Sequence, residues 1–143
     1  MLRRLRATVV VRHAGQVVAR TSAALEVLET SHPPSVYLPP DAFVPGVLRP
    51  GDGSSFCEFK GSARYLDLVT AGSGVLSAVA WTYPDPTPAF TDLARYVSLY
   101  PGRVEACTVD GESVRPQGGD FYGGWVTDAV VGPWKGGPGT WGW

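Results

Sequence analysis

The sequence predicts a mainly β fold, a compact single domain of bent antiparallel sheets, barrel-like or tent-like, with one short helix. The chain has 143 residues, of which 18 are glycine and 13 are proline, and this composition favours many turns between short strands. Several apolar runs alternate with polar residues, as strands do when one face is buried. A chain of this length can bury a core without disulfides or metals.

The first third of the chain predicts a hairpin and a third run. Residues 7–12 are rich in β-branched side chains, residues 13–16 have a turn composition, and residues 17–20 return as a strand. Residues 23–28 fit a strand or a short helix, and the alternation of apolar and polar residues slightly favours the strand. Four prolines between residues 29 and 41 then exclude regular helix and most ladder pairing.

The central stretch, residues 55–65, contains a cysteine, a lysine and three aromatic residues. Its alternation predicts two strand-like runs bent at Gly61, the second continuing to Val69, and residues 75–81 form the next strand. Thr91 resembles a helix N-cap, and apolar residues at helical spacing predict the one helix at about 91–100. The Asp110-Gly111 pair is typical of a two-residue hairpin turn.

The last part of the chain, residues 118–143, is rich in glycine and tryptophan. It is too aromatic for a plain linker. We expect residues 1–117 to form the β-rich domain and residues 118–143 to be an ordered extension packed on it, with a short turn at about 127–131.

The overall charge limits the partners. The formal net charge is −1, so nothing recruits nucleic acid or an anionic membrane. The apolar run of residues 7–11 is too short for a signal-peptide core, and no run approaches the length of a membrane-spanning helix. We therefore expect a soluble, cytoplasmic protein whose two cysteines, Cys57 and Cys107, are free thiols.

Lys60 is the first candidate for chemistry, because the chain contains only two lysines against ten arginines. A lysine amine can bind an anion or, when desolvated, act as a nucleophile; the alternative is a surface lysine whose stem covers Phe59. Cys57 lies three residues earlier and could be a reactive thiolate beside this cation. The alternative for Cys57 is a small core residue.

Aromatic residues beside the proline-rich breaks predict a pocket rim. Tyr37, Trp81 and Tyr83 occupy such positions, where rings hold a shape and hydroxyl groups offer hydrogen bonds. They could equally be core residues under long loops. Glu29 or Arg12 would add a charged partner to this site.

Several classes of site are absent from the sequence. The histidines and cysteines have no paired spacing for a metal, so we expect no metal and no cofactor. There is no Gly-x-Ser-x-Gly elbow for a catalytic serine. No Gly-x-x-x-x-Gly-Lys phosphate loop occurs.

Several motifs occur together in this sequence: Glu29-Thr30, Tyr37-x-Pro39, Cys57-x-x-Lys60-Gly61, Ala63-x-Tyr65 and Ala80-Trp81-x-Tyr83-Pro84. In combination they make the sequence resemble the domain-of-unknown-function family 427, which is also described as nucleotidyltransferase-like. The resemblance covers about residues 8–115, and the glycine- and tryptophan-rich ending looks like that of actinobacterial members. The resemblance implies a mostly β domain with short helices. The sequence departs from the family's usual Pro-Tyr at Glu58-Phe59, and it lacks the Asp-x-Asp pair that nucleotidyl transfer with two metals usually needs.

These observations together predict a pocket for small-molecule binding or catalysis around the Cys-x-x-Lys-Gly strand and the Ala-Trp-x-Tyr segment. The alternatives are a non-catalytic interaction module, such as one that forms a homodimer, or nucleotidyl transfer. The candidate catalytic residues are Lys60, Cys57 and Glu29, and the candidate substrate-binding residues are Tyr37, Tyr65, Trp81, Tyr83 and Arg12.

Overall fold

The structure is a computed structural model that describes residues 1–29, 33–116 and 123–127. Its strands are all paired antiparallel, which confirms the predicted mainly β fold. The described strands do not close into a barrel. They are β1 (Leu2–Arg4), β2 (Val9–His13), β3 (Gln16–Thr21), β4 (Leu25–Val27), β5 (Ser35–Tyr37), β6 (Leu48–Cys57), β7 (Gly61–Thr70), β8 (Gly74–Thr82), β9 (Val97–Leu99), β10 (Ala106–Val109), β11 (Glu112–Ser113), β12 (Arg115–Pro116) and β13 (Trp125–Val126).

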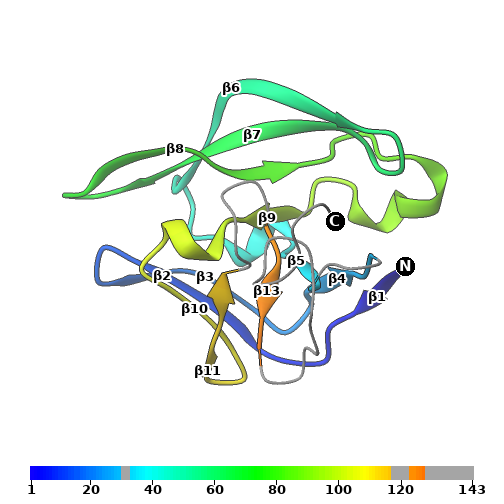
Figure 1. Ribbon diagram of the computed structural model, residues 1–143. Helices are drawn as coiled ribbons and strands as arrows, with labels where there is room; N and C mark the ends of the chain where they lie inside the picture. The colour runs from blue at the N-terminus through cyan, green and yellow to red at the C-terminus, as the bar shows by residue number, and fades with distance from the viewer. Residues whose placement is uncertain (30–32, 117–122, 128–143) are drawn as a thin grey trace, which may run out of the picture.

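Two four-stranded sheets form the two layers of the domain. One has the order β6-β7-β8-β9 and the other has the order β11-β10-β2-β3. Figure 1 shows β6, β7 and β8 above the layer of β2, β3 and β10. A third sheet, β1-β4-β5, is linked to β9 by an isolated bridge between Leu38 and Val97, so β5 lies beside the end of the first sheet.

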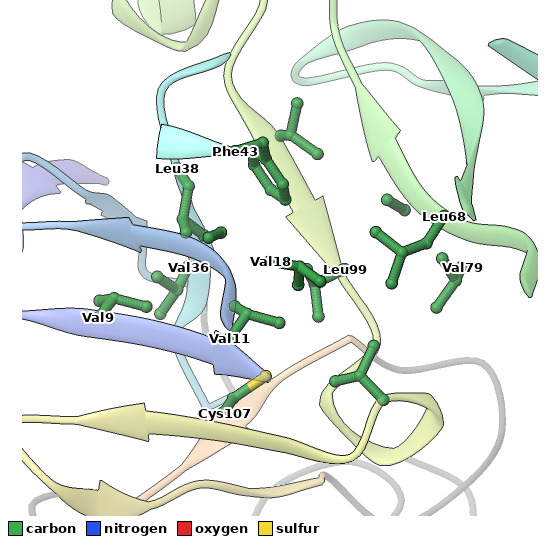
Figure 2. Packing of buried hydrophobic residues seen from close by; sticks show 14 of the residues in the cluster. Val9, Val11, Val18, Val36, Leu38, Phe43, Leu68, Val79, Leu99 and Cys107 are labelled. Carbon is green, nitrogen blue, oxygen red and sulfur yellow. The ribbon is translucent and has the colours of Figure 1, made fainter. Parts of the chain in front are cut away.

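The main core lies between these layers. Valines of β2 and β3 point toward leucine and valine side chains of β7, β8 and β9, as Figure 2 shows. Full burial of each such side chain contributes about 1.5–3 kcal/mol, so the core between the sheets is the main source of stability. The labelled residues are Val9, Val11, Val18, Val36, Leu38, Phe43, Leu68, Val79, Leu99 and Cys107.

The structure confirms the predicted hairpins. β2 and β3 pair around the turn at Ala14-Gly15, where both residues have positive φ. β10 and β11 pair around Asp110-Gly111, which also have positive φ, as a type I′ turn requires. Residues 25–27 form a strand rather than a short helix.

The predicted helix at 91–100 is wrong in its type and its bounds. The structure has a short 3-10 helix, η2, at Pro88–Leu93, and residues 97–99 form β9 instead. The helical run ends at Leu93, because Ala94 has a non-helical ψ of 121°. Arg95 follows with a φ of 66°, and residues 97–99 pair with β8. Tertiary pairing therefore overrides the helical spacing of the apolar residues. The other helices are also 3-10 turns, η1 (Pro40–Ala42) and η3 (Pro101–Arg103), and no helix in the described ranges is long and apolar enough to cross a membrane.

The described part of the C-terminal extension packs on the domain. β13 pairs with β12, and the Trp125 side chain is buried in the main core. Its backbone N–H donates to the Pro34 carbonyl at 2.8 Å, and its ring Nε1 donates to the Leu99 carbonyl at 3.3 Å. Of the expected turn at about 127–131, only residue 127 is described. Residues 118–122 and 128–143 lie outside the described residues.

Candidate functional site

The turn between β6 and β7 positions Lys60. The strands pair up to Cys57 and Gly61, so residues 58–60 form the turn, and the predicted bend at Gly61 lies at its end. Gly61 has a φ of 109°, and a Cβ on it would lie 3.3 Å from the Asp85 carbonyl oxygen. The Thr87 N–H donates to the Lys60 carbonyl at 3.0 Å, and the Thr87 hydroxyl donates to the Phe59 carbonyl. A glycine therefore lets this turn lie directly against residues 85–87.

Lys60 and Glu29 form an ion pair. The distance between Lys60 Nζ and Glu29 Oε1 is 2.7 Å, and the exposed fractions of the two side chains are 11% and 44%. Burial lowers the pKa of Lys60, but the hydrogen bond to Glu29 and the interaction with Tyr83 outweigh it, so the net pKa is above its ordinary value. The amine is therefore an ammonium ion at neutral pH, which donates hydrogen bonds and is not a nucleophile in this state.

Aromatic side chains surround this ion pair. Lys60 Nζ lies 5.8 Å from the centroid of the Tyr83 ring, within cation–π range. The Tyr37 and Tyr83 rings are 6.3 Å apart, and the Trp81 and Tyr100 rings are 4.8 Å apart. Burial raises the pKa values of both Tyr37 and Tyr83, so their hydroxyl groups are neutral at neutral pH.

These side chains enclose a cavity of about 250 Å³. Hydroxyl-bearing residues dominate its wall, and Lys60 and Glu29 are the only lysine, arginine or carboxylate side chains among its described lining residues. The lining residues are Val27, Glu29, Pro33, Ser35, Tyr37, Ser55, Lys60, Tyr65, Trp81, Tyr83, Tyr100, Gly123 and Gly124. The cavity thus offers hydrogen bonds of both kinds beside flat apolar surfaces.

The C-terminal extension forms part of the cavity wall. A Cβ on Gly123 would overlap the six-membered ring of Trp81, whose Cζ2 lies 3.0 Å from that position. Gly123 is therefore the close-packed neighbour of Trp81. Sequence reasoning did not identify Gly123. Two consecutive glycines directly before Trp125 are nevertheless a signal that the backbone closely approaches another group there. It also missed Tyr100, Ser35 and Ser55, for which the sequence carries no particular signal.

The structure brings most of the sequence-predicted site residues together. The cavity is lined by Glu29, Tyr37, Lys60, Tyr65, Trp81 and Tyr83. Cys57 does not line it: this residue ends β6, is half-buried, and packs against a second apolar cluster that includes Tyr37, Ala63 and Tyr83. Arg12 does not line it either, because it is an exposed residue of β2 that lies opposite Ala106 and Val17 in the other four-stranded sheet.

Both cysteines are free, and burial raises the pKa of the Cys107 thiol to about 12. Among the described residues, no group of three or more His, Cys, Asp or Glu side chains is placed to hold a metal ion.

Fold and site together define a small antiparallel β domain with one polar, aromatic-walled cavity beside a lysine turn. A comparison with protein families narrows the class of protein: the model of the domain of unknown function DUF427 matches residues 1–110. The chain therefore belongs to the DUF427 family, which confirms the resemblance seen in its motifs. No curated protein matches the chain. Gly123 and Gly124, which complete the cavity wall, lie beyond the matched range.

Proposed function

We propose that this protein binds a small molecule in the cavity beside Lys60. The observation that carries the proposal is the Lys60–Glu29 ion pair in the wall of a cavity that four tyrosines and Trp81 also line. The Lys60 ammonium donates to a carboxylate or carbonyl oxygen of the ligand, and this interaction is strong because the donor is charged. The apolar part of the ligand contacts the rings of Trp81 and Tyr100.

The protonation state of Lys60 supports a binding and polarising role. An ammonium ion cannot attack a carbonyl carbon, but it withdraws electron density from a carbonyl oxygen to which it donates. The neutral Tyr83 hydroxyl beside it adds a second possible donor. The proposal does not use the Cys57 thiol, which lies outside the described lining of the cavity.

The size of the cavity favours a ligand smaller than a nucleotide. Sites for drug-sized ligands have volumes of roughly 300–1,000 Å³, and this cavity has about 250 Å³. A compact metabolite therefore fits this proposal better than nucleotidyl transfer does, although the family also carries a nucleotidyltransferase label.

A thermal-shift screen of keto acids, amino acids, aromatic metabolites and nucleotides tests the proposal. At a ligand concentration of about ten times Kd, binding adds about 1.4 kcal/mol of stability, which raises the Tm of a chain this size by about 5 °C. We expect this shift in the wild type and its loss in Lys60→Met. The matched control is Arg12→Met, which removes a cation that does not line the cavity and should keep the shift.

Two results would contradict the proposal. One is a ligand that stabilises the wild type and Lys60→Met equally, because that ligand binds elsewhere. The other is the absence of any ligand together with a dimer that dissociates when Phe56 and Phe59 are replaced. These two side chains at the β6–β7 turn are 75% and 68% exposed, and that result would favour the interaction-module alternative.

A further inference from the structure

Within the described part of the cavity wall, one positive and one negative side chain lie in direct contact. Among the described lining residues, Lys60 contributes one positive charge and Glu29 contributes one carboxylate. The two charged groups are in direct contact, at 2.7 Å. Any charged group of a ligand that contacts one of them therefore lies within a few ångströms of the other.

This balance disfavours a ligand that carries only an anion. A carboxylate placed on the Lys60 ammonium is attracted by Lys60 and repelled by the adjacent Glu29 carboxylate, so the two interactions largely cancel. It must also compete with Glu29 for the same ammonium donors. A ligand that carries only a cation meets the same difficulty with the signs reversed.

A zwitterion avoids both costs. In an α-amino acid the ammonium and carboxylate groups are attached to one carbon, so they can lie side by side against Glu29 and Lys60. Each charge of the ligand then meets an opposite charge on the protein, and each contact is a charge-assisted hydrogen bond. The ligand extends the existing ion pair into a ring of four alternating charges.

The two protein groups are differently exposed, which gives the ligand an orientation. The Glu29 side chain is 44% exposed and the Lys60 side chain is 11% exposed. The ligand ammonium thus lies toward the cavity mouth, and the carboxylate lies deeper, beside the Tyr83 ring. The side chain of the ligand is left to contact the rings of Trp81 and Tyr100.

We infer that the ligand class of this cavity is a zwitterion of amino-acid size, bound by its carboxylate to Lys60 and by its ammonium group to Glu29. This inference rests on the proposed function, because it requires Lys60 to bind an acceptor group. It adds a role for Glu29 in ligand recognition and a defined ligand class.

Matched probes that differ in one charge test the inference. L-Phenylalanine has both charges, 3-phenylpropionate lacks the ammonium group, and phenethylamine lacks the carboxylate; L-leucine and 4-methylpentanoate repeat the comparison with an aliphatic side chain. Titrations followed by amide NMR shifts give the affinities and the site. We expect each amino acid to bind about ten-fold or more tighter than its analogues, the factor that a charged hydrogen bond provides.

Variants then assign the two contacts. Glu29→Gln should weaken L-phenylalanine about ten-fold and leave 3-phenylpropionate unchanged or tighter, because the repulsive carboxylate is gone. The matched control is Glu58→Gln. It removes the same charge at an exposed residue of the turn that contains Lys60, and Glu58 does not line the cavity. The wild-type comparison alone decides the ligand class, so the test stands even where a variant folds poorly.

The outcomes separate the inference from the proposed function. Tighter, Lys60-dependent binding of 3-phenylpropionate would overturn the zwitterion and keep the proposed function. Failure of both amino acids to bind at millimolar concentration would also overturn the zwitterion. In that case a Lys60-dependent ligand from the thermal-shift screen would still support the proposed function. If the screen found no such ligand, the zwitterion inference and the proposed function would both be wrong.

Discussion

Trp81 Nε1 donates a hydrogen bond of 3.0 Å to the hydroxyl oxygen of Tyr37. The two rings meet edge to face, with centroids 6.5 Å apart and planes at 86°, which is a favourable aromatic geometry. Trp81 belongs to β8 and Tyr37 to β5, which lie in different sheets. This contact therefore joins two walls of the cavity and holds the Trp81 ring in a defined orientation.

Tyr37→Phe should destabilise the protein by about 1–2 kcal/mol. The substitution keeps the buried ring but removes the acceptor of the Trp81 N–H, which is then left without its partner in a partly buried position. Urea unfolding followed by tryptophan fluorescence measures the change. Tyr65→Phe also removes a hydroxyl from the cavity wall and should cost less than half as much. An equal loss in the two variants would mean that the Tyr37–Trp81 bond does not contribute specially.

The Lys60–Glu29 pair should show a coupling free energy of about 1 kcal/mol in a double-mutant cycle. This lies between an exposed pair, at about 0.2–1 kcal/mol, and a fully buried pair, because Lys60 is buried while Glu29 is 44% exposed. The cycle uses Lys60→Met, Glu29→Gln and the double variant, unfolded in urea at low and high salt. A coupling within error of zero would show that the pair is held by its surroundings and not by its charges.

Local alternation was sufficient to predict several strands and two hairpins. The hairpins at 9–21 and 106–113 and the strand at 75–81 follow from apolar periodicity and from turn residues such as Asp110-Gly111. The segment at 91–100 could not be predicted this way, because its strand forms only through tertiary pairing with β8. Helical spacing of apolar residues is compatible with either structure when both bury the same side chains.

The residues that line the candidate site were predictable where they are unusual in sequence. Lys60 is one of two lysines and Trp81 and Tyr83 flank a proline-rich break, so composition alone selected them. Arg12 was chosen by chemistry alone, and the structure places it in a different sheet from the cavity. Gly123 was missed because its role depends on its contact with Trp81, which only the fold creates.

Gly61→Ala should cost more than a glycine substitution in an open turn. Gly61 and Gly72 both have positive φ, at 109° and 82°, but a Cβ meets nothing within 4 Å at Gly72 and meets the Asp85 carbonyl at 3.3 Å at Gly61. Gly72→Ala should therefore lose about 1 kcal/mol from backbone strain alone. Gly61→Ala should lose about 2–3 kcal/mol and should also weaken ligand binding, because Lys60 is the next residue. Equal losses in urea unfolding would contradict the packing of this turn against residues 85–87.

Gly123→Ala should alter the cavity while leaving the backbone conformation allowed. The new methyl group overlaps the Trp81 ring and forces it to move. We expect a shifted tryptophan emission spectrum and an affinity for the cavity ligand about ten-fold lower, as expected when a wall of a small site moves. In a Trp81→Phe background, where the ring is shorter, Gly123→Ala should cost much less stability than it does in the wild type, so the two substitutions should be non-additive. If Gly123→Ala changes neither emission nor affinity, the extension does not form the cavity wall in solution.

Alkaline pH should destabilise the protein from about pH 9 upward, beginning with Cys107. Burial raises the pKa of this thiol from 9.0 to about 12, so the unfolded chain loses the proton first and stability falls as pH rises through this window. The fall is about 1.4 kcal/mol per pH unit for one such group. Above pH 10, Tyr37 and Tyr83 add to it, because burial raises their pKa values from 10.0. Lys60 acts in the same direction, because its pKa is raised above 10.5 in the folded state. Above pH 10.5 the unfolded chain therefore loses this proton first, and stability falls further.

Cys107→Ala separates the contribution of the thiol from that of the tyrosines. The variant should lose stability at pH 7, because it removes a buried side chain from the main core. Between pH 9 and 10, however, its free energy of unfolding should fall by about 1 kcal/mol less than that of the wild type. Urea unfolding at closely spaced pH values measures both slopes. Parallel curves for the two proteins would mean that the Cys107 thiol ionises as readily in the folded state as in the unfolded chain, and that the alkaline transition belongs to the cavity tyrosines and Lys60 instead.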